Sequence, residues 1–162
     1  SSSRARLGGL LSVLEKYSLP RPERYFVSSA RQAQSGGLTV TKELDFMVSG
    51  IKSYLEVNHD LQAVLTVNDA VAVRFYVACK QLNLSIPDDL AIDSFGDLDI
   101  DQILTPTLTS FNHNIAQLGE AAATLIQQRI SGWAGPEQTI EIPYSLHIRE
   151  SCGYRQLTQK TS

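Results

Sequence analysis

The 162-residue chain is 43% hydrophobic and 19% charged, a composition typical of a globular domain that buries a core without disulfide staples. Its net charge of −3 argues against a nucleic-acid-binding surface, which would normally be basic. No stretch approaches the roughly 20 apolar residues needed to span a bilayer. Cys79 and Cys152 have neither metal-binding nor redox spacing. We therefore expect reduced thiols, no cofactor, no metal site, no membrane partner and a cytoplasmic location.

Apolar residues at helical spacing predict two helices in the N-terminal part of the chain. The first begins at Ser2 or Ser3, ends near Tyr17 and carries a leucine stripe made of Leu7, Leu10, Leu11 and Leu14. The second begins at about Thr39 and carries a stripe of predicted core residues: Val40, Leu44, Met47, Ile51 and Leu55. Between the two helices, residues 25–28 are a candidate strand.

The middle of the chain reads as a strand, a helix and a second strand, the pattern of a βαβ unit. Residues 61–67 are almost entirely apolar, as expected of a parallel strand that is covered on both faces. Asp69 is the predicted N-cap of the following helix, and Leu90 begins the next strand. Open sheets of this kind bind ligands beyond the carboxyl ends of their strands, where Asn68 and the loop 96–101 fall.

The C-terminal part of the chain alternates between strand and helix patterns. The predicted elements are a strand at 108–111, an amphipathic helix at 115–130, and strands at 139–142 and 144–148. Asn112 or Asn114 is the expected cap of the helix, and Gly132 is its expected end. The histidines occur singly and are interpreted as structural or surface residues rather than ligands or bases: His59, His113 and His147.

Short motifs follow one another in a consistent order and spacing along nearly the whole chain. The central motifs are Asn68-Asp69, Ile86-Pro87-Asp88-Asp89, Ser94-Phe95-Gly96-Asp97 and Pro106-Thr107-Leu108-Thr109-Ser110. The outer motifs are the opening run from Ser3 to Gly9 and the closing run from Ile148 to Gly153. Together these motifs resemble the effector-binding domain of the lactose/galactose-repressor family of bacterial transcription regulators.

The resemblance implies an α/β fold with a doubly wound parallel sheet, similar to the periplasmic binding proteins. Residues 1–107 would form most of the C-terminal subdomain of the effector-binding domain. Residues 108–142 would be a crossover segment that belongs to the N-terminal subdomain, and residues 143–162 would return to the C-terminal subdomain and end in a tail. An N-terminal part, including a helix-turn-helix headpiece, would be missing from this sequence.

The resemblance also implies where an effector binds. Arg6 matches the arginine that clamps the effector's sugar, and Asn68 matches an asparagine that bonds sugar hydroxyls through its amide. Phe95 or Tyr25 would stack on the ligand. The pair Gly96-Asp97 stands where most relatives carry two acids, so a carboxylate is lost from the expected pocket. Together with Arg6, this loss favours a sugar acid such as gluconate over a neutral sugar. The alternatives are a solvent-facing arginine and an asparagine that bonds only local backbone.

Three functions are weighed for such a domain. We expect the effector-sensing and dimerising part of a DNA-binding transcription regulator, whose partners are a sugar or sugar acid, a second copy of the chain, and DNA through the absent headpiece. The alternative is a periplasmic sugar-binding protein of a transport system. An enzyme is disfavoured, because the sequence has no glycine-rich phosphate loop, no nucleophile elbow and no paired cysteine and histidine cluster.

Overall fold

The computed structural model describes residues 2–19 and 40–154. The chain clusters into two compact units, residues 1–59 and residues 60–162, and each unit is considered by itself. In the described ranges no helix combines the length and apolar character that crossing a membrane requires. The predicted strand at 25–28, and with it Tyr25, lies outside the described residues.

The first unit contains the two predicted helices. Helix α1 spans Ser2–Lys16, and its four leucines are half-buried: Leu7, Leu10, Leu11 and Leu14. Helix α2 spans Val40–Val57, and one side of it is buried: Met47, Val48, Ile51 and Leu55. Both helix predictions are confirmed, because the 3.6-residue period of the apolar residues is a local property that sets which side of each helix avoids water.

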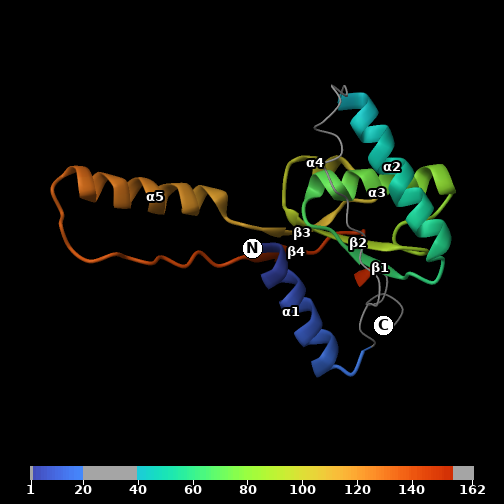
Figure 1. Ribbon diagram of the computed structural model, residues 1–162, viewed down its shortest axis with the longest axis horizontal. Helices are drawn as coiled ribbons and strands as arrows, with labels where there is room; N and C mark the ends of the chain where they lie inside the picture. Colours follow the sequence, from blue (N-terminus) through green and yellow to red (C-terminus); the bar gives the residue numbers. More distant parts are fainter. Residues whose placement is uncertain (1, 20–39, 155–162) are drawn as a thin grey trace. The chain divides into compact units, whose positions relative to one another are not determined.

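The second unit is built on a four-stranded sheet in the order β1-β2-β3-β4 (Figure 1). Its strands are β1 (Ala63–Leu65), β2 (Ala91–Gly96), β3 (Thr109–Asn112) and β4 (Ser145–His147). The first three strands are parallel, and β4 returns antiparallel to β3. Helix α3 (Asp69–Leu82) connects β1 to β2 and packs on β2. The predicted βαβ unit and the predicted α/β fold class are therefore confirmed.

Strand β2 is covered more completely on one face than on the other. Ile92 and Ser94 are buried, whereas Asp93 and Phe95 alternate with them and are only half-buried. The prediction that 61–67 is a strand covered on both faces is wrong for β1, where only Val64 is even half-buried. The physical reason is that the faces of a strand are covered by packed helices, and in the described residues of the second unit α3 packs on β2 rather than on β1.

The segment that follows β3 departs from the sheet. Helix α5 spans Ile115–Ile130 as predicted, has no buried residue, and lies apart from the sheet in Figure 1. The predicted strand at 139–142 is wrong. The last pair between β3 and β4 joins Asn112 to Ser145. Because the chain enters α5 shortly after Asn112, the residues before Ser145 find no partner strand among residues 2–19 and 40–154. A short helix, α4 (Ile100–Ile103), precedes β3.

Candidate functional site at the carboxyl ends of the parallel strands

The step between β1 and α3 is organised by Asn68. Its backbone is extended (φ −166°), and its Oδ1 accepts a hydrogen bond of 3.0 Å from the Val71 N–H. Asn68 is therefore the N-cap of α3, and the prediction that Asp69 caps this helix is wrong. The Asn68 side chain is exposed, and among the described residues its amide nitrogen has no hydrogen-bond partner. The amide group remains able to donate to a ligand while its oxygen holds the helix end.

Asp69 joins three elements of the second unit from a buried position. Its Oδ1 accepts from the Ser110 hydroxyl on β3 at 3.0 Å, and its Oδ2 accepts from the Leu98 N–H at 3.2 Å. Only 1% of the residue is exposed. A buried carboxylate requires such partners, because losing water without them would cost several kcal/mol. Asp69 thus ties the start of α3 to the loop after β2 and to β3.

Gly96 is required by the position of Asp69. Its φ is +150°, and a Cβ built there would lie 2.1 Å from Asp69 Oδ2. A side chain would therefore clash with the buried carboxylate. The premise that Gly96 leaves this region with less negative charge does not hold, because the Asp69 carboxylate lies against it. The predicted preference for a sugar acid then depends on Arg6 alone.

Asp97 is the centre of a charged network at the end of β2. Its Oδ1 accepts from Arg149 Nη2 at 2.5 Å, and its Oδ2 accepts from Asn112 Nδ2 and lies 2.7 Å from His147 Nδ1. Arg149 also donates from Nη1 to the Leu108 carbonyl at 2.6 Å. Only 7% of the Asp97 side chain is exposed. Its carboxylate is therefore occupied by protein groups and supports the surrounding loop.

The carboxylates around Arg149 titrate differently. Burial on its own would raise the pKa of Asp97, but hydrogen bonds from Arg149 and Asn112 and the charge of Arg149 outweigh it, so that pKa is lowered. Burial raises the pKa of Asp101 to about 6, and the neighbouring charge of Asp69 adds to the effect. Neither Asp101 oxygen has a hydrogen-bond partner in the described chain, and Arg149 Nη1 is 3.9 Å away. Asp101 is therefore poorly compensated when it is charged.

Two other predicted site residues, Phe95 and Arg6, are not part of the network around Asp97. The Phe95 ring stacks on Phe111, with centroids 4.7 Å apart and planes 17° apart, and it meets the edge of His113 at 6.3 Å. One face of Phe95 is thus already covered. Arg6 is half-buried in α1, in the first unit, and its contact with an effector stays a prediction.

The structure thus gathers Asn68, Gly96 and Asp97 around Asp69 at one end of the parallel strands. Sequence reasoning missed the roles of Asn112, His147 and Arg149, which reach Asp97 from β3, β4 and the residues after β4. The signal for Arg149 was present in the closing motif that carries the family resemblance. No sequence signal marked His147.

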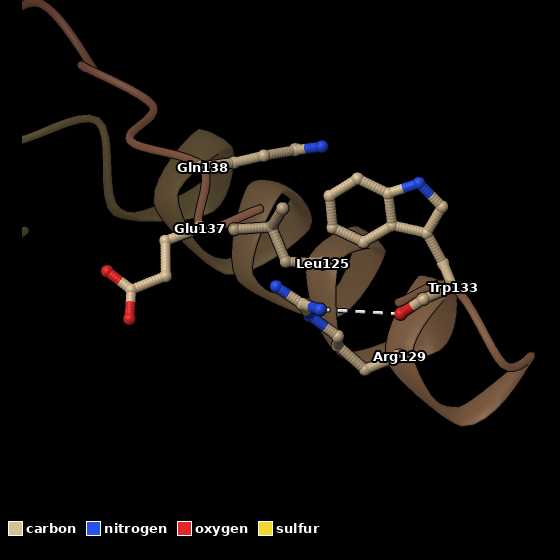
Figure 2. A pocket seen from close by; sticks show the side chains of 5 residues that line it. All are labelled: Leu125, Arg129, Trp133, Glu137 and Gln138. Atoms are coloured by element: carbon tan, nitrogen blue, oxygen red, sulfur yellow. Dashed lines mark hydrogen bonds between the residues drawn. The ribbon is translucent and has the colours of Figure 1, made fainter. Parts of the chain in front are cut away.

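A hollow lies on α5, away from this cluster, and is formed by local contacts (Figure 2). It has a volume of about 260 Å³ and is lined by Leu125, Arg129, Trp133, Glu137 and Gln138. The Arg129 guanidinium lies over the Trp133 ring, 4.5 Å from its centroid, and donates to the Gly135 carbonyl at 2.9 Å. Arg129 therefore closes the turn after the helix. Across the described chain, no three His, Cys, Asp or Glu side chains are grouped as metal ligands.

Polar groups gather beyond the carboxyl ends of the parallel strands, which is where open α/β sheets usually hold their ligands. A family model described as a periplasmic binding protein-like domain matches residues 1–152. The chain belongs to this family, and its resemblance to the effector-binding domain of the lactose/galactose-repressor regulators is confirmed.

Individual relatives place the chain in context. It is 29% identical over 151 residues to the ribose operon repressor of Escherichia coli (strain K12), a match that covers 92% of this chain and 42% of the repressor. A LacI family transcriptional regulator from Enterococcus faecium with bound ribose has a TM-score of 0.72 at 21% identity, over 91% of this chain and 51% of that one. A regulator from Lactobacillus casei with bound sucrose has a TM-score of 0.69 at 19% identity, over 92% and 51%. The chain therefore spans about half the length of these relatives.

Proposed function

We propose that the chain is the effector-sensing domain of a DNA-binding transcription regulator whose effector is a sugar or sugar acid. The observation that carries this proposal is the cluster at the carboxyl ends of β1, β2 and β3, where an exposed amide stands beside a buried charged network. The family match and the sugar-bound structural neighbours support a small polyhydroxyl ligand.

In this proposal Asn68 and Arg6 are the direct polar contacts. The Asn68 amide offers a donor at the rim of the site while its oxygen holds α3, and a guanidinium suits either hydroxyl or carboxylate oxygens. Gly96 lets the end of β2 pack against the Asp69 carboxylate, and Phe95 contributes the part of its ring that Phe111 leaves open. The carboxylates of Asp69, Asp97 and Asp101 outnumber the single Arg149 guanidinium among them, and this excess of negative charge favours a neutral sugar over a sugar acid.

The coupling to DNA follows from differential binding. We propose that residues 108–142 belong to a second lobe, that 1–107 and 143–162 belong to the first, and that the effector prefers one closure of the two lobes. That preference would bias a DNA-binding headpiece in a cytoplasmic homodimer. The regulators among the relatives favour this reading over a transport protein or an enzyme.

A ligand panel on the intact protein tests the proposal. Thermal shift and calorimetry would compare D-ribose, D-glucose and sucrose with D-gluconate and ribose 5-phosphate, and DNA binding would be measured with and without each hit. We expect at least one sugar to bind and to change DNA affinity. Binding of no panel member, or binding that leaves DNA affinity unchanged, would contradict the proposal. Tighter binding of gluconate than of glucose would restore the sugar-acid prediction.

A further inference from the structure

We propose that His147 contacts the effector directly and that Asp97 acts through it as a positioning residue; this inference rests on the proposed function. His147 lies on β4, opposite Ser110 of β3 in the antiparallel register. Its Nδ1 is 2.7 Å from Asp97 Oδ2. Sequence reasoning treated this histidine as a structural or surface residue, because nothing near it in sequence suggests a partner.

The contact with Asp97 determines which atom of the ring is left for a ligand. An ionised carboxylate only accepts hydrogen bonds, so the proton of the neutral imidazole must sit on Nδ1. The lone pair is then on Nε2, which becomes a hydrogen-bond acceptor. Since the Asp97 carboxylate is itself held by Arg149 and Asn112, the ring is anchored before any ligand arrives. Such preorganisation lowers the entropic cost of binding.

Exposure distinguishes His147 from the rest of the network. Its side chain is 44% exposed, against 7% for Asp97 and 15% for Arg149. Within the described part of the chain, Nε2 has no hydrogen-bond partner. His147 is thus the most exposed side chain of this network, and Nε2 is its polar atom that is left open to a ligand.

The other polar groups of the network are already engaged. The Asp97 oxygens accept from Arg149 and Asn112 and meet His147, while Asn112 Oδ1 accepts from the Asn114 N–H at 2.6 Å. The acid predicted to touch the effector is therefore occupied, and its influence passes to the ring that it orients. A fixed, exposed acceptor fits the hydroxyl group of a polyol, which donates its proton to Nε2.

Calorimetry on the intact protein tests this contact with D-ribose, D-glucose and D-gluconate, each beside its monodeoxy analogues. His147→Ala should weaken binding of the bound parent compound about tenfold, the equivalent of about 1.4 kcal/mol for one lost hydrogen bond. It should leave unchanged the affinity for the one analogue that lacks the contacted hydroxyl. His147→Gln, which keeps an acceptor, should recover part of the loss, and His59→Ala is the control.

The outcomes separate this contact from the proposed function. Unchanged affinity in His147→Ala, or an equal loss for the parent and every deoxy analogue, overturns the contact, because a structural role would weaken all ligands alike. If Asn68→Asp loses binding while His147→Ala keeps it, the function stands and the inference fails. If the wild-type protein binds no member of the ligand panel, both fail together.

Discussion

At the scale of residues, Gly96 shows that a residue far away in sequence can determine which residue type fits at a position. The glycine and Asp69 are separated by α3, yet the Asp69 carboxylate occupies the space that a side chain at 96 would need. From the family resemblance alone, Gly96 was interpreted as the loss of an acidic residue. The structure shows that a different acid lies there.

Gly96→Ala should therefore destabilise the protein. The added methyl would meet Asp69 Oδ2 at 2.1 Å, and its backbone φ of +150° disfavours any side chain. We expect a loss of about 2–4 kcal/mol in the free energy of unfolding, measured by urea denaturation. Gly119→Ala, on open α5 with no atom near its Cβ, is the matched control and should be neutral or slightly stabilising. An unchanged unfolding midpoint in Gly96→Ala would contradict the packing described for Asp69.

Asp101 should make stability depend on pH. Its pKa in the folded state is raised to about 6 from 3.8, so the folded state disfavours the charged form. The cost is absent below about pH 4, grows as the pH rises to about 6, and is complete above that; it is at most on the order of 3 kcal/mol. Asp101→Asn should therefore stabilise the protein by about 1–3 kcal/mol at pH 7.5 and by much less at pH 4.5.

Unfolding at those two pH values, with the exposed Asp99→Asn as control, checks this prediction. A stabilisation of equal size at both pH values would show that charge is not the cause. A destabilised Asp101→Asn protein at pH 7.5 would show that the carboxylate is compensated after all.

At the scale of elements, helix α3 and the binding site share one residue. Asn68 uses Oδ1 to cap the helix, so Asn68→Ala should lose about 1 kcal/mol of stability in addition to any ligand contact. Asp is an equally good N-cap but cannot donate. Asn68→Asp should therefore keep the free energy of unfolding within a few tenths of a kcal/mol of the wild-type value. It should still weaken sugar binding about tenfold or more.

Paired unfolding and calorimetry experiments on the two variants separate the roles. Wild-type sugar affinity in Asn68→Asp would remove Asn68 from the site. A large stability loss in the same variant would mean that its amide nitrogen has a structural task as well.

At the scale of the whole molecule, α5 presents an apolar surface that no described residue of the second unit covers. Four of its side chains are more than half exposed: Ile115, Leu118, Ile126 and Ile130. Large exposed apolar patches promote association. The 162-residue chain alone should therefore self-associate, and Ile126→Glu combined with Ile130→Glu should lower its average mass toward the 17.8 kDa of a monomer.

Sedimentation equilibrium measures this change. Gln127→Glu combined with Gln128→Glu adds the same charge to α5 without removing apolar surface, and it should leave the average mass high. A monomeric wild-type chain, or equal effects of the two double variants, would contradict the role of the isoleucines.

Much of the architecture follows from the sequence, because helix and strand periods are local. The pattern of apolar residues predicted α1, α2, α3, α5 and the βαβ unit, and it located Asn68 and Gly96-Asp97 at strand ends. The family was implied by the resemblance of the short motifs, not by the apolar pattern. The prediction of a strand at 139–142 failed because strand formation there depended on whether a partner strand was present. The prediction of the α3 cap failed because it depended on which of two adjacent polar side chains reached a backbone N–H.

The network around Asp97 could be decided only by the tertiary structure. Arg149 lies 52 residues from Asp97 in sequence, and His147 reaches it only because β4 pairs antiparallel with β3 in one register. A register shift of one residue would point His147 to the other face of the sheet. The sequence therefore determined which elements form and in what order, whereas the pairing of strands determined which polar atoms are buried together and which is left open.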